Sequence, residues 1–360
     1  LNSLWGDCLL YDGEASKIGA QCLQRLGKDV KRLQGLQGTL EAFSWSEFFM
    51  TRGIDYKGDE VRTARAFEWR NIEPALPREI GRVPLEDVCT LGAHHYVVNF
   101  DLYLKDRDAW TLGRAPRVMV ADEHWPEVCT GLLCSGVCTL LPAEDLFDTG
   151  KGPLLNGLFG VTKEEWAGDV EVYRLIMNLI PLNNLVHPLR GDVNTLPMWS
   201  MMNPFFIQPG EQLLISSEDV RCFFYTMAVP PSWWKYLGFN KRVPDCCLPA
   251  HLQGREVYLA SKVLPMGFLN SVSLAQHVHR NLALWSGEAD DDVNLPENEI
   301  RKDRSSTVGN PSWRIYLDNY DLLERVKATG VTSVQGSMAP SVLALRNEYE
   351  KWEVPRNLKK

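Results

Sequence analysis

The stretch Arg314-Ile-Tyr-Leu-Asp-Asn-Tyr-Asp-Leu-Leu323 sets two short apolar runs on either side of an Asp-Asn pair. Asp and Asn accept the backbone conformations of tight turns, so we expect a strand, a turn at this pair and a returning strand. Such a turn holds the carboxylate of Asp318 at the tip of a hairpin, where it can bind a metal ion. In a second interpretation, Asp318 only makes the turn. Segments elsewhere in the chain favour the first interpretation.

A second acidic segment lies upstream of this hairpin. Residues 212–229 begin with an apolar run that predicts a strand, which delivers Glu218 and Asp219 and then turns into an aromatic segment. Adjacent residues of a strand point to opposite faces, so only one of these two carboxylates can share a site with Asp318. Trp233 and Trp234 follow on a proline-marked loop, either as a core wedge or as a base-stacking platform.

Two more segments carry groups that recognise anions. The β-branched and apolar run at 172–180 predicts a strand that carries Arg174, which can pair with a carboxylate or bind a phosphate. A strand at 258–269 runs into Leu-Pro-Met-Gly267, and Asn270 is expected to cap the helix that follows. A glycine before a helix N-terminus lets a ligand approach the backbone closely, and the free amides there favour anions.

In their order along the chain, from the strand with Arg174 through Asp219 and Gly267 to the Asp318 hairpin, the four segments resemble the fingers and palm of reverse transcriptases, especially those of retrotransposons and retroviruses. The resemblance spans roughly residues 125–360. Residues 173–183 resemble the fingers motif, residues 219–224 the first palm motif, residues 264–276 the Leu-Pro-x-Gly loop, and residues 316–319 the Tyr-x-Asp-Asp box. Four motifs in a fixed order are more specific than any one of them.

The resemblance implies an α+β fold, the fingers and palm of a right-hand polymerase, with an antiparallel palm sheet packed on helices. Residues 121–360 would form these fingers and palm, truncated before the thumb. Residues 1–120 match no motif and are expected to form a helix-rich N-terminal region of unassigned role. Because the chain begins with Leu1 and ends at Lys360 without an evident stop signal, we expect a piece of a longer polypeptide.

Reverse transcriptases transfer a nucleotide from a dNTP to a primer 3′-hydroxyl on an RNA or DNA template. By resemblance, this chain is an RNA-directed DNA polymerase domain of a retroelement. Two metal ions, Mg²⁺ or Mn²⁺, would activate the hydroxyl and neutralise the leaving pyrophosphate. Asp219, Asp318 and the backbone carbonyl of Val220 would hold these ions, and Asn319 completes the catalytic set.

The resemblance also assigns residues that bind the substrate. Lys163 and Arg174 would bind the triphosphate of the incoming nucleotide. Gly267 and Gln276 would line the nucleotide and the template. The ring of Phe224 falls where the family keeps an aromatic gate against the sugar 2′-hydroxyl, and such a gate favours dNTP over rNTP.

Departures from the family's pattern keep a second interpretation open. Asn319 replaces the second Asp of the box, which removes a negative charge but keeps an oxygen ligand. Ile180 and Asn178 replace an Arg and an Asp of the fingers motif. Glu218 and Asp321 would offset the lost charge if they joined the site, but we expect both to be solvated. A catalytically degenerate relative would keep the fold and nucleic-acid binding, whereas an unrelated interaction protein would keep the two predicted carboxylate ligands apart.

The composition indicates an intracellular protein, cytoplasmic or nuclear. The net charge of −8 argues against a nucleic-acid footprint over the whole surface, and a local basic groove stays open. Nine cysteines are too dilute for a disulfide scaffold, so we expect reduced thiols. His124 and the cysteines at 129, 134 and 138 form a cluster, but their spacing differs from that of structural zinc sites. No apolar run approaches the ~18–20 residues that span a bilayer, so no membrane partner is expected. The oligomeric state stays open.

Helical spacing of apolar residues predicts further helices. They lie at 14–36, 125–141, 271–285 and 338–352, and core packing is their expected role. A basic face on the first of them would also suit nucleic acid. Residues 42–75 resemble helices packed on one another, and the acidic residues 285–304 are expected to form a mobile insertion.

Overall fold

The computed structural model describes residues 63–197, 207–288, 294–304, 310–328 and 339–357. Contacts between Cα atoms group residues 63–360 into one compact unit. The helix predicted at 14–36 and most of the segment predicted at 42–75 lie outside the described residues.

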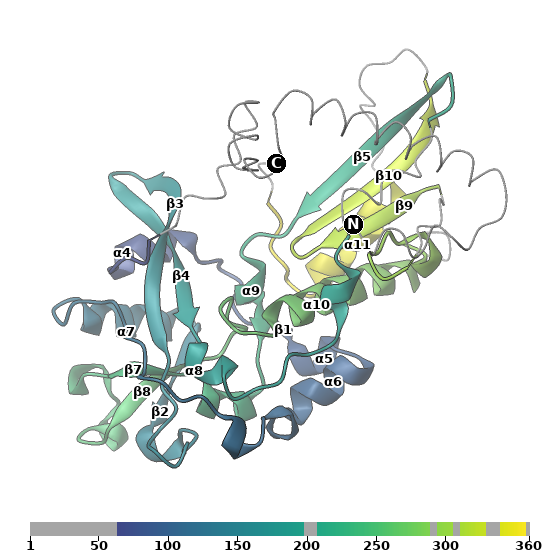
Figure 1. Ribbon diagram of the computed structural model, residues 1–360. Coiled ribbons are helices and arrows are strands. Elements are labelled where there is room, and N and C mark those ends of the chain that lie inside the picture. The colour runs from purple at the N-terminus through teal and green to yellow at the C-terminus, as the bar shows by residue number, and fades with distance from the viewer. Residues whose placement is uncertain (1–62, 198–206, 289–293, 305–309, 329–338, 358–360) are drawn as a thin grey trace, which may run out of the picture. The chain divides into compact units, whose positions relative to one another are not determined.

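Helices and strands are mixed along the described chain (Figure 1). The helices are α4 (Trp69–Ile72), α5 (Leu85–Val88), α6 (Leu91–Val98), α7 (Trp125–Cys134), α8 (Ile180–Asn183), α9 (Phe223–Thr226), α10 (Ser271–Glu288) and α11 (Pro340–Lys351). The strands are β1 (Val83–Pro84), β2 (Cys138–Pro142), β3 (Gly157–Ala167), β4 (Val170–Asn178), β5 (Glu211–Asp219), β6 (Met227–Ala228), β7 (Gly238–Arg242), β8 (Val257–Ser261), β9 (Ser312–Tyr316) and β10 (Asn319–Lys327). Apart from the short parallel pair β1–β6, these strands pair antiparallel, so the predicted α+β class agrees with the described structure.

One antiparallel sheet joins β5, β10 and β9 in that order, and we call it the acidic sheet. Successive side chains alternate between its faces. Tyr320 and Leu322 lie on the buried face, together with Glu218. Ser217 and Ile215 lie on the other face and are exposed. Helix α10 packs against β9, and α11 packs along α10, so these two helices support the sheet (Figure 1).

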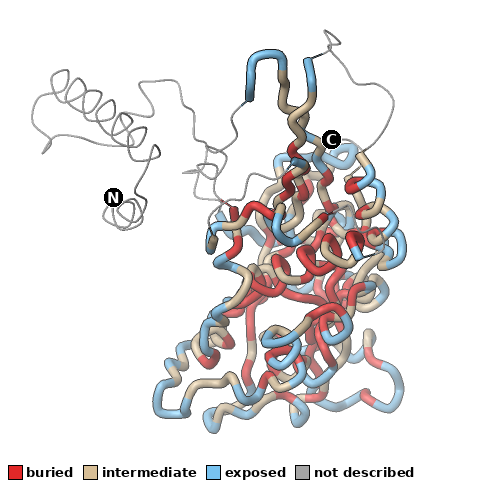
Figure 2. The backbone as a smooth tube through the Cα atoms, turned by 90° about the vertical axis from the view of Figure 1, so that its right-hand side faces the viewer, coloured by how far each residue is buried: buried red, intermediate tan, exposed pale blue. Residues whose placement is uncertain are grey.

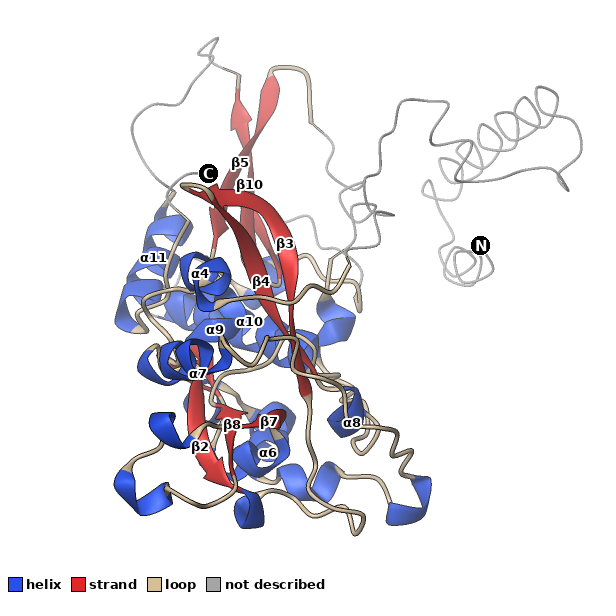
Figure 3. Cartoon of the chain, turned by 90° about the vertical axis from the view of Figure 1, so that its left-hand side faces the viewer, coloured by secondary structure: helices blue, strands red, loops and turns tan. Residues whose placement is uncertain are grey.

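The long β3–β4 hairpin is a separate two-stranded sheet (Figure 3). Its register shifts between Thr162 and Glu165, where β3 carries a bulge. Arg65 and Val118 each form a bridge to β3. Residues on both sides of position 120 therefore pack in the same unit, and the predicted difference in role between 1–120 and 121–360 stays a prediction.

A single cluster of apolar side chains runs through the described unit, and the exposed segments are mainly its outer loops (Figure 2). Trp233 is only 1% exposed, and its indole Nε1 donates to the carbonyl of Val97 at 2.8 Å. The core interpretation of Trp233 is therefore confirmed. Helix α10 is buried around most of its circumference, including polar Gln276 and His279. The sequence predicted one buried apolar face for this helix, whereas the structure buries most of its sides.

Two predicted elements have different ends in the structure. The helix predicted at 125–141 stops at Cys134, because Gly136 takes a positive φ of 84° and residues 138–142 pair with β8 as strand β2. The helix predicted at 338–352 is confirmed as α11, which buries Val342, Leu345 and Tyr349.

The acidic segment at 285–304 also differs from its prediction. Helix α10 continues to Glu288, and residues 294–304 return to the core. Glu299 is 2% exposed and pairs with Arg280. The prediction of a mobile insertion is therefore wrong for residues 294–304. No helix in the described ranges has the length and apolar character that crossing a membrane requires.

Candidate active site

The hairpin predicted from residues 314–323 is present, but its turn lies one residue earlier. Tyr316 pairs with Asn319, so Leu317 and Asp318 make the turn. Leu317 takes a left-handed φ of 54°, a conformation that costs energy for a non-glycine residue. The amide N–H of Leu317 donates to Oε1 of Gln276 at 2.9 Å, which helps to hold this turn. Asn319 is therefore the first residue of β10 rather than part of the turn.

The structure brings the two predicted carboxylate ligands together. Asn319 stands opposite Asp219 in the register of β10 and β5. The backbone N–H of Val220 donates to the carbonyl of Asp318 at 2.8 Å. Asp219 and Asp318, 99 positions apart in the chain, thus lie at the same end of the acidic sheet.

Both carboxylates accept a hydrogen bond from an asparagine. Nδ2 of Asn319 donates to Oδ1 of Asp318 at 2.9 Å. Nδ2 of Asn357 donates to Oδ2 of Asp219 at 2.8 Å, and the backbone of Asn357 also donates to the Asp219 carbonyl. Asn357 belongs to a C-terminal segment that pairs with Val220 through Arg356. No sequence motif had pointed to Asn357.

Glu218 and Asp321 are not solvated, so that prediction is wrong. Glu218 is 6% exposed on the buried face and accepts from Nε of Arg346 at 2.6 Å. Asp321 accepts from Nε of Arg314 at 2.8 Å and from the hydroxyl of Ser217 at 2.5 Å. Because an arginine balances each of these carboxylates, neither replaces the charge that Asn319 lacks.

Lys163 and Arg174 both lie on the β3–β4 hairpin. Lys163 sits at the bulge, with Nζ 3.1 Å from a carboxylate oxygen of Glu165. Burial raises the pKa of the Cys222 thiol, and the nearby positive charge of Lys163 lowers it in part. Cys222 follows Asp219 by three positions, so the charge of Lys163 acts on a residue just after β5. Arg174 is exposed, opposite Val161 in the hairpin register.

Gly267 is needed for a close approach, although what approaches it here is the chain's own backbone. A Cβ at this position would lie 2.1 Å from the carbonyl oxygen of Met177, at the end of β4. Asn183 donates to the Gly267 carbonyl at 2.9 Å and accepts from the Leu269 amide at 2.8 Å. The loop is thereby locked to the base of the β3–β4 hairpin. Contact of Gly267 with a nucleotide stays a prediction.

Helix α10 starts at Ser271 as predicted, and the side chain of Asn270, just before it, bonds to neighbouring segments. Its side-chain Nδ2 donates to the hydroxyl of Tyr96 at 2.7 Å and to the carbonyl of His187 at 3.0 Å. Its Oδ1 accepts from the amide of Leu189 at 2.8 Å. Asn270 thus joins the helix start to the two segments beside it.

Gln276 is fully buried and acts on the hairpin rather than at a surface. Its Nε2 donates to the carbonyl of Ile315 at 3.0 Å, while its Oε1 accepts from Leu317. With both ends of the amide bonded to the hairpin, Gln276 does not line an open nucleotide or template site in this structure. Phe224 is half-buried in α9 and packs against the core, so its predicted gating role stays a prediction.

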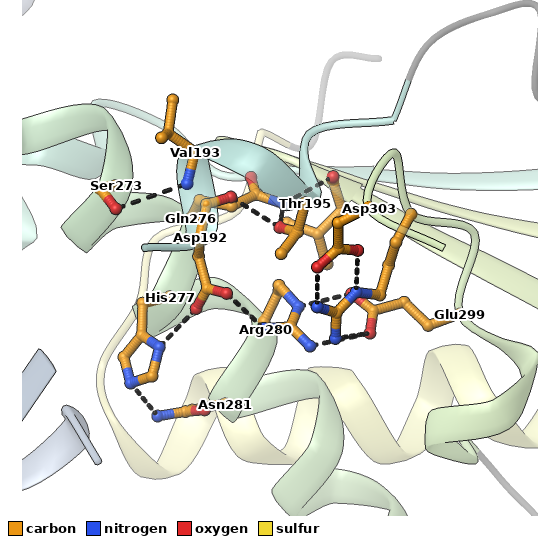
Figure 4. A network of polar contacts seen from close by, with 12 residues as sticks. Asp192, Val193, Thr195, Ser273, Gln276, His277, Arg280, Asn281, Glu299 and Asp303 are labelled. Carbon is orange, nitrogen blue, oxygen red and sulfur yellow. Dashed lines mark hydrogen bonds and ion pairs between the residues drawn. The ribbon is translucent and has the colours of Figure 1, made fainter. Parts of the chain in front are cut away.

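A polar network joins residues 192–195 and 299–303 to α10 (Figure 4). Oδ2 of Asp192 lies 2.5 Å from Nδ1 of His277, and its Oδ1 accepts from Arg280 at 2.8 Å. Arg280 also donates from Nε and Nη2 to both carboxylate oxygens of Glu299, at 2.5 and 2.9 Å. Arg301 continues the network to Asp303. Asp192 had no sequence signal because its partners, His277 and Arg280, lie 85 and 88 positions away in the chain.

In the ranges that the structure covers, no group of three or more His, Cys, Asp or Glu side chains is arranged to hold a metal ion. The acidic sheet offers two carboxylates and amide oxygens instead. Cys129 and Cys138 are buried, and burial raises the pKa of each thiol, which disfavours the thiolate that zinc needs.

No protein-family model matches this chain, and a search of curated proteins also gives no match.

Proposed function

We propose that this chain is an RNA-directed DNA polymerase domain, which transfers a nucleotide from a dNTP to a primer 3′-hydroxyl on an RNA or DNA template. One observation carries the proposal. Asp219 and Asp318, assigned from separate motifs, meet at one end of the acidic sheet through the Val220–Asp318 hydrogen bond of 2.8 Å. If the motif matches were due to chance, as in an unrelated interaction protein, Asp219 and Asp318 would have no reason to lie close together.

The donors at this end of the sheet suit a hard divalent cation. Carboxylate oxygens of Asp219 and Asp318, the Val220 carbonyl and the side-chain oxygen of Asn319 are ligands of the kind that Mg²⁺ and Mn²⁺ prefer. A bound cation would supply activation of the primer hydroxyl and neutralisation of charge on the pyrophosphate. The amides of Asn319 and Asn357 satisfy the carboxylates in the structure described here. An amide can turn its oxygen toward a cation, so these contacts are compatible with metal binding.

The β3–β4 hairpin supports the substrate side of the proposal. The positive charge of Lys163 acts on Cys222, just after β5, and Arg174 is exposed on the neighbouring strand of the hairpin. Two cations on this hairpin suit the triphosphate of a nucleotide. Gly267 joins the base of the hairpin to α10, and Gln276 holds the turn that carries Asp318. In this proposal Gln276 positions the site and does not contact substrate.

A second candidate function is binding without catalysis. The observation that favours it is the amide of Asn319, which stands where the family has an acid and donates to Asp318. With two carboxylates instead of three, the site holds one negative charge fewer against a divalent cation. A degenerate relative would keep the fold and bind template and primer through backbone phosphates, with strong salt dependence.

Binding of Mn²⁺ in the presence of dNTP tests the first proposal without needing a thumb. Asp219→Ala and Asp318→Ala should each weaken Mn²⁺ binding by more than about tenfold, because each removes a ligand. Asp321→Asn is the matched control, since its carboxylate lies on β10, two residues after Asn319, but is balanced by Arg314. If the intact chain binds no Mn²⁺, or if all three variants bind alike, the second candidate replaces the first.

A further inference from the structure

A buried histidine joins α10 and α11 to the turn that carries Asp318. His279 of α10 is fully buried. Its Nδ1 lies 2.5 Å from the carbonyl oxygen of Leu317, and its Nε2 is hydrogen-bonded to the hydroxyl of Tyr349 on α11. Tyr349 is also fully buried. A line of contacts therefore runs from α11 through α10 to the turn.

The chemistry of the groups fixes the direction of these hydrogen bonds. A carbonyl oxygen can only accept, so Nδ1 of His279 carries the proton that it donates to Leu317. Burial lowers the pKa of His279 to about 4, so the ring is neutral near physiological pH. Nε2 must then accept, and the hydroxyl of Tyr349 donates to it. Burial also raises the pKa of Tyr349 well above its ordinary value, which keeps this donor protonated.

The turn has a specific need for this support. Leu317 occupies the left-handed region, where a non-glycine residue persists only if its surroundings hold it. Gln276 holds the N–H of Leu317, and His279 holds its carbonyl. The peptide group that joins Leu317 to Asp318 is thus fixed by His279. Its orientation decides where the next residue, Asp318, presents its carboxylate.

We propose that His279 and Tyr349 are positioning residues that orient Asp318 toward Asp219, so that the docking of α11 sets the affinity of the site for a divalent cation. This inference rests on the proposed function for its consequence, but the positioning itself can be measured without metal. Outer-shell partners of metal ligands commonly change affinity by about 10–100-fold when removed.

Tyr349→Phe tests the proposal with the smallest change, because it deletes one hydroxyl and keeps the ring in the core. Tyr96→Phe is the matched control: Tyr96 is also fully buried, and its hydroxyl bonds to Asn270 instead of to the hairpin support. His279→Leu removes both hydrogen bonds. His279→Asn keeps a donor near the position of Nδ1 and should restore part of what His279→Leu loses.

Amide hydrogen exchange in metal-free protein is the first readout. The N–H groups of Leu317 and Val220 report on the turn, since they bond to Gln276 and to the Asp318 carbonyl. We expect their exchange to rise about tenfold in Tyr349→Phe and further in His279→Leu, with no local rise in Tyr96→Phe. Unchanged exchange at these two amides in both His279→Leu and Tyr349→Phe would overturn the proposal, whatever the metal result.

Mn²⁺ affinity is the second readout, and it separates the positioning role of His279 and Tyr349 from the proposed function. We expect about tenfold weaker binding in Tyr349→Phe and partial recovery in His279→Asn relative to His279→Leu. If the intact chain binds Mn²⁺ and these variants bind it equally well, the positioning role fails while the proposed function stands. If the intact chain binds none, the proposed function fails, and the exchange result alone decides whether His279 and Tyr349 hold the turn.

Discussion

Arg346 of α11 donates from Nε to the buried carboxylate of Glu218 at 2.6 Å, directly beside Asp219 on β5. Arg356 adds a longer contact of 3.6 Å to the same carboxylate. Helix α11 and the segment after it therefore hold the strand end that carries Asp219, as the Tyr349–His279 contact holds the turn that carries Asp318.

Removing the arginine of this pair should destabilise the protein. Arg346→Met leaves the Glu218 carboxylate buried with only the longer Arg356 contact, and we expect a loss of about 2 kcal/mol in the free energy of unfolding, since Arg346 itself is partly exposed. Denaturant unfolding measures this loss. The double variant Arg346→Met/Glu218→Gln should recover part of it, and a double variant as unstable as the sum of both single variants would contradict the pairing.

The loop glycine should be intolerant of even one methyl group. In Gly267→Ala the new Cβ would meet the backbone carbonyl of Met177, which cannot move aside as a flexible side chain would. We expect a loss of about 2–3 kcal/mol in the free energy of unfolding. Gly92→Ala is the control, because Gly92 lies in α6 with open space around it, and alanine should stabilise that helix by about 0.5–1 kcal/mol. Equal effects of the two substitutions would refute the close approach.

The buried His279 predicts a specific dependence of stability on pH. Burial lowers its pKa from 6.5 to about 4 in the folded protein, so between these values the unfolded chain binds a proton that the folded chain does not. Above pH 6.5 this difference does not affect the free energy of unfolding. As the pH falls from 6.5 toward 4, protonation of the unfolded chain lowers the free energy of unfolding by roughly 3 kcal/mol in total. Denaturant unfolding between pH 6.5 and 4 should show that the free energy of unfolding of His279→Leu falls by roughly 3 kcal/mol less than that of the intact chain. Parallel pH profiles for the intact chain and the variant would contradict the assignment.

Restoring the missing acid should exchange stability for metal affinity. Asn319→Asp places a third carboxylate beside Asp318 and opposite Asp219, so the metal-free protein should lose about 1 kcal/mol through repulsion between like charges. Added Mn²⁺ should reverse the loss and bind about tenfold more tightly than to the intact chain. Thermal unfolding with EDTA and with Mn²⁺ measures both effects. A variant that is less stable in both conditions would show that residue 319 does not face the site.

Local sequence patterns predicted several elements because their causes are local. Two short apolar runs on either side of an Asp-Asn pair predicted the β9–β10 hairpin, and the helical spacing of apolar residues predicted α11. The adjacent acids at 218 and 219 had to face opposite ways, and they do: Glu218 is buried against Arg346, whereas Asp219 pairs across to Asn319.

What the sequence did not reveal depends on residues far apart in the chain. The turn begins at Leu317 because Gln276 and His279, on a helix packed beneath the hairpin, stabilise a conformation that leucine rarely adopts alone. Asp321 is paired because Arg314 stands opposite it across the hairpin. Asn357 reaches Asp219 only through the docking of the C-terminal segment beside β5. Such contacts need the register of the sheet, which no local pattern encodes.

The proposed function requires Asp219 and Asp318 to share one cation site, and a double-mutant cycle on Mn²⁺ affinity tests this requirement most directly. Mn²⁺ binding with dNTP present would be measured for the intact chain, Asp219→Ala, Asp318→Ala and the double variant. If both carboxylates bind the same ion, the double variant should lose little more affinity than the worse single variant, because the first substitution already removes the site. Losses that simply add, or variants that bind Mn²⁺ as the intact chain does, would contradict a shared site.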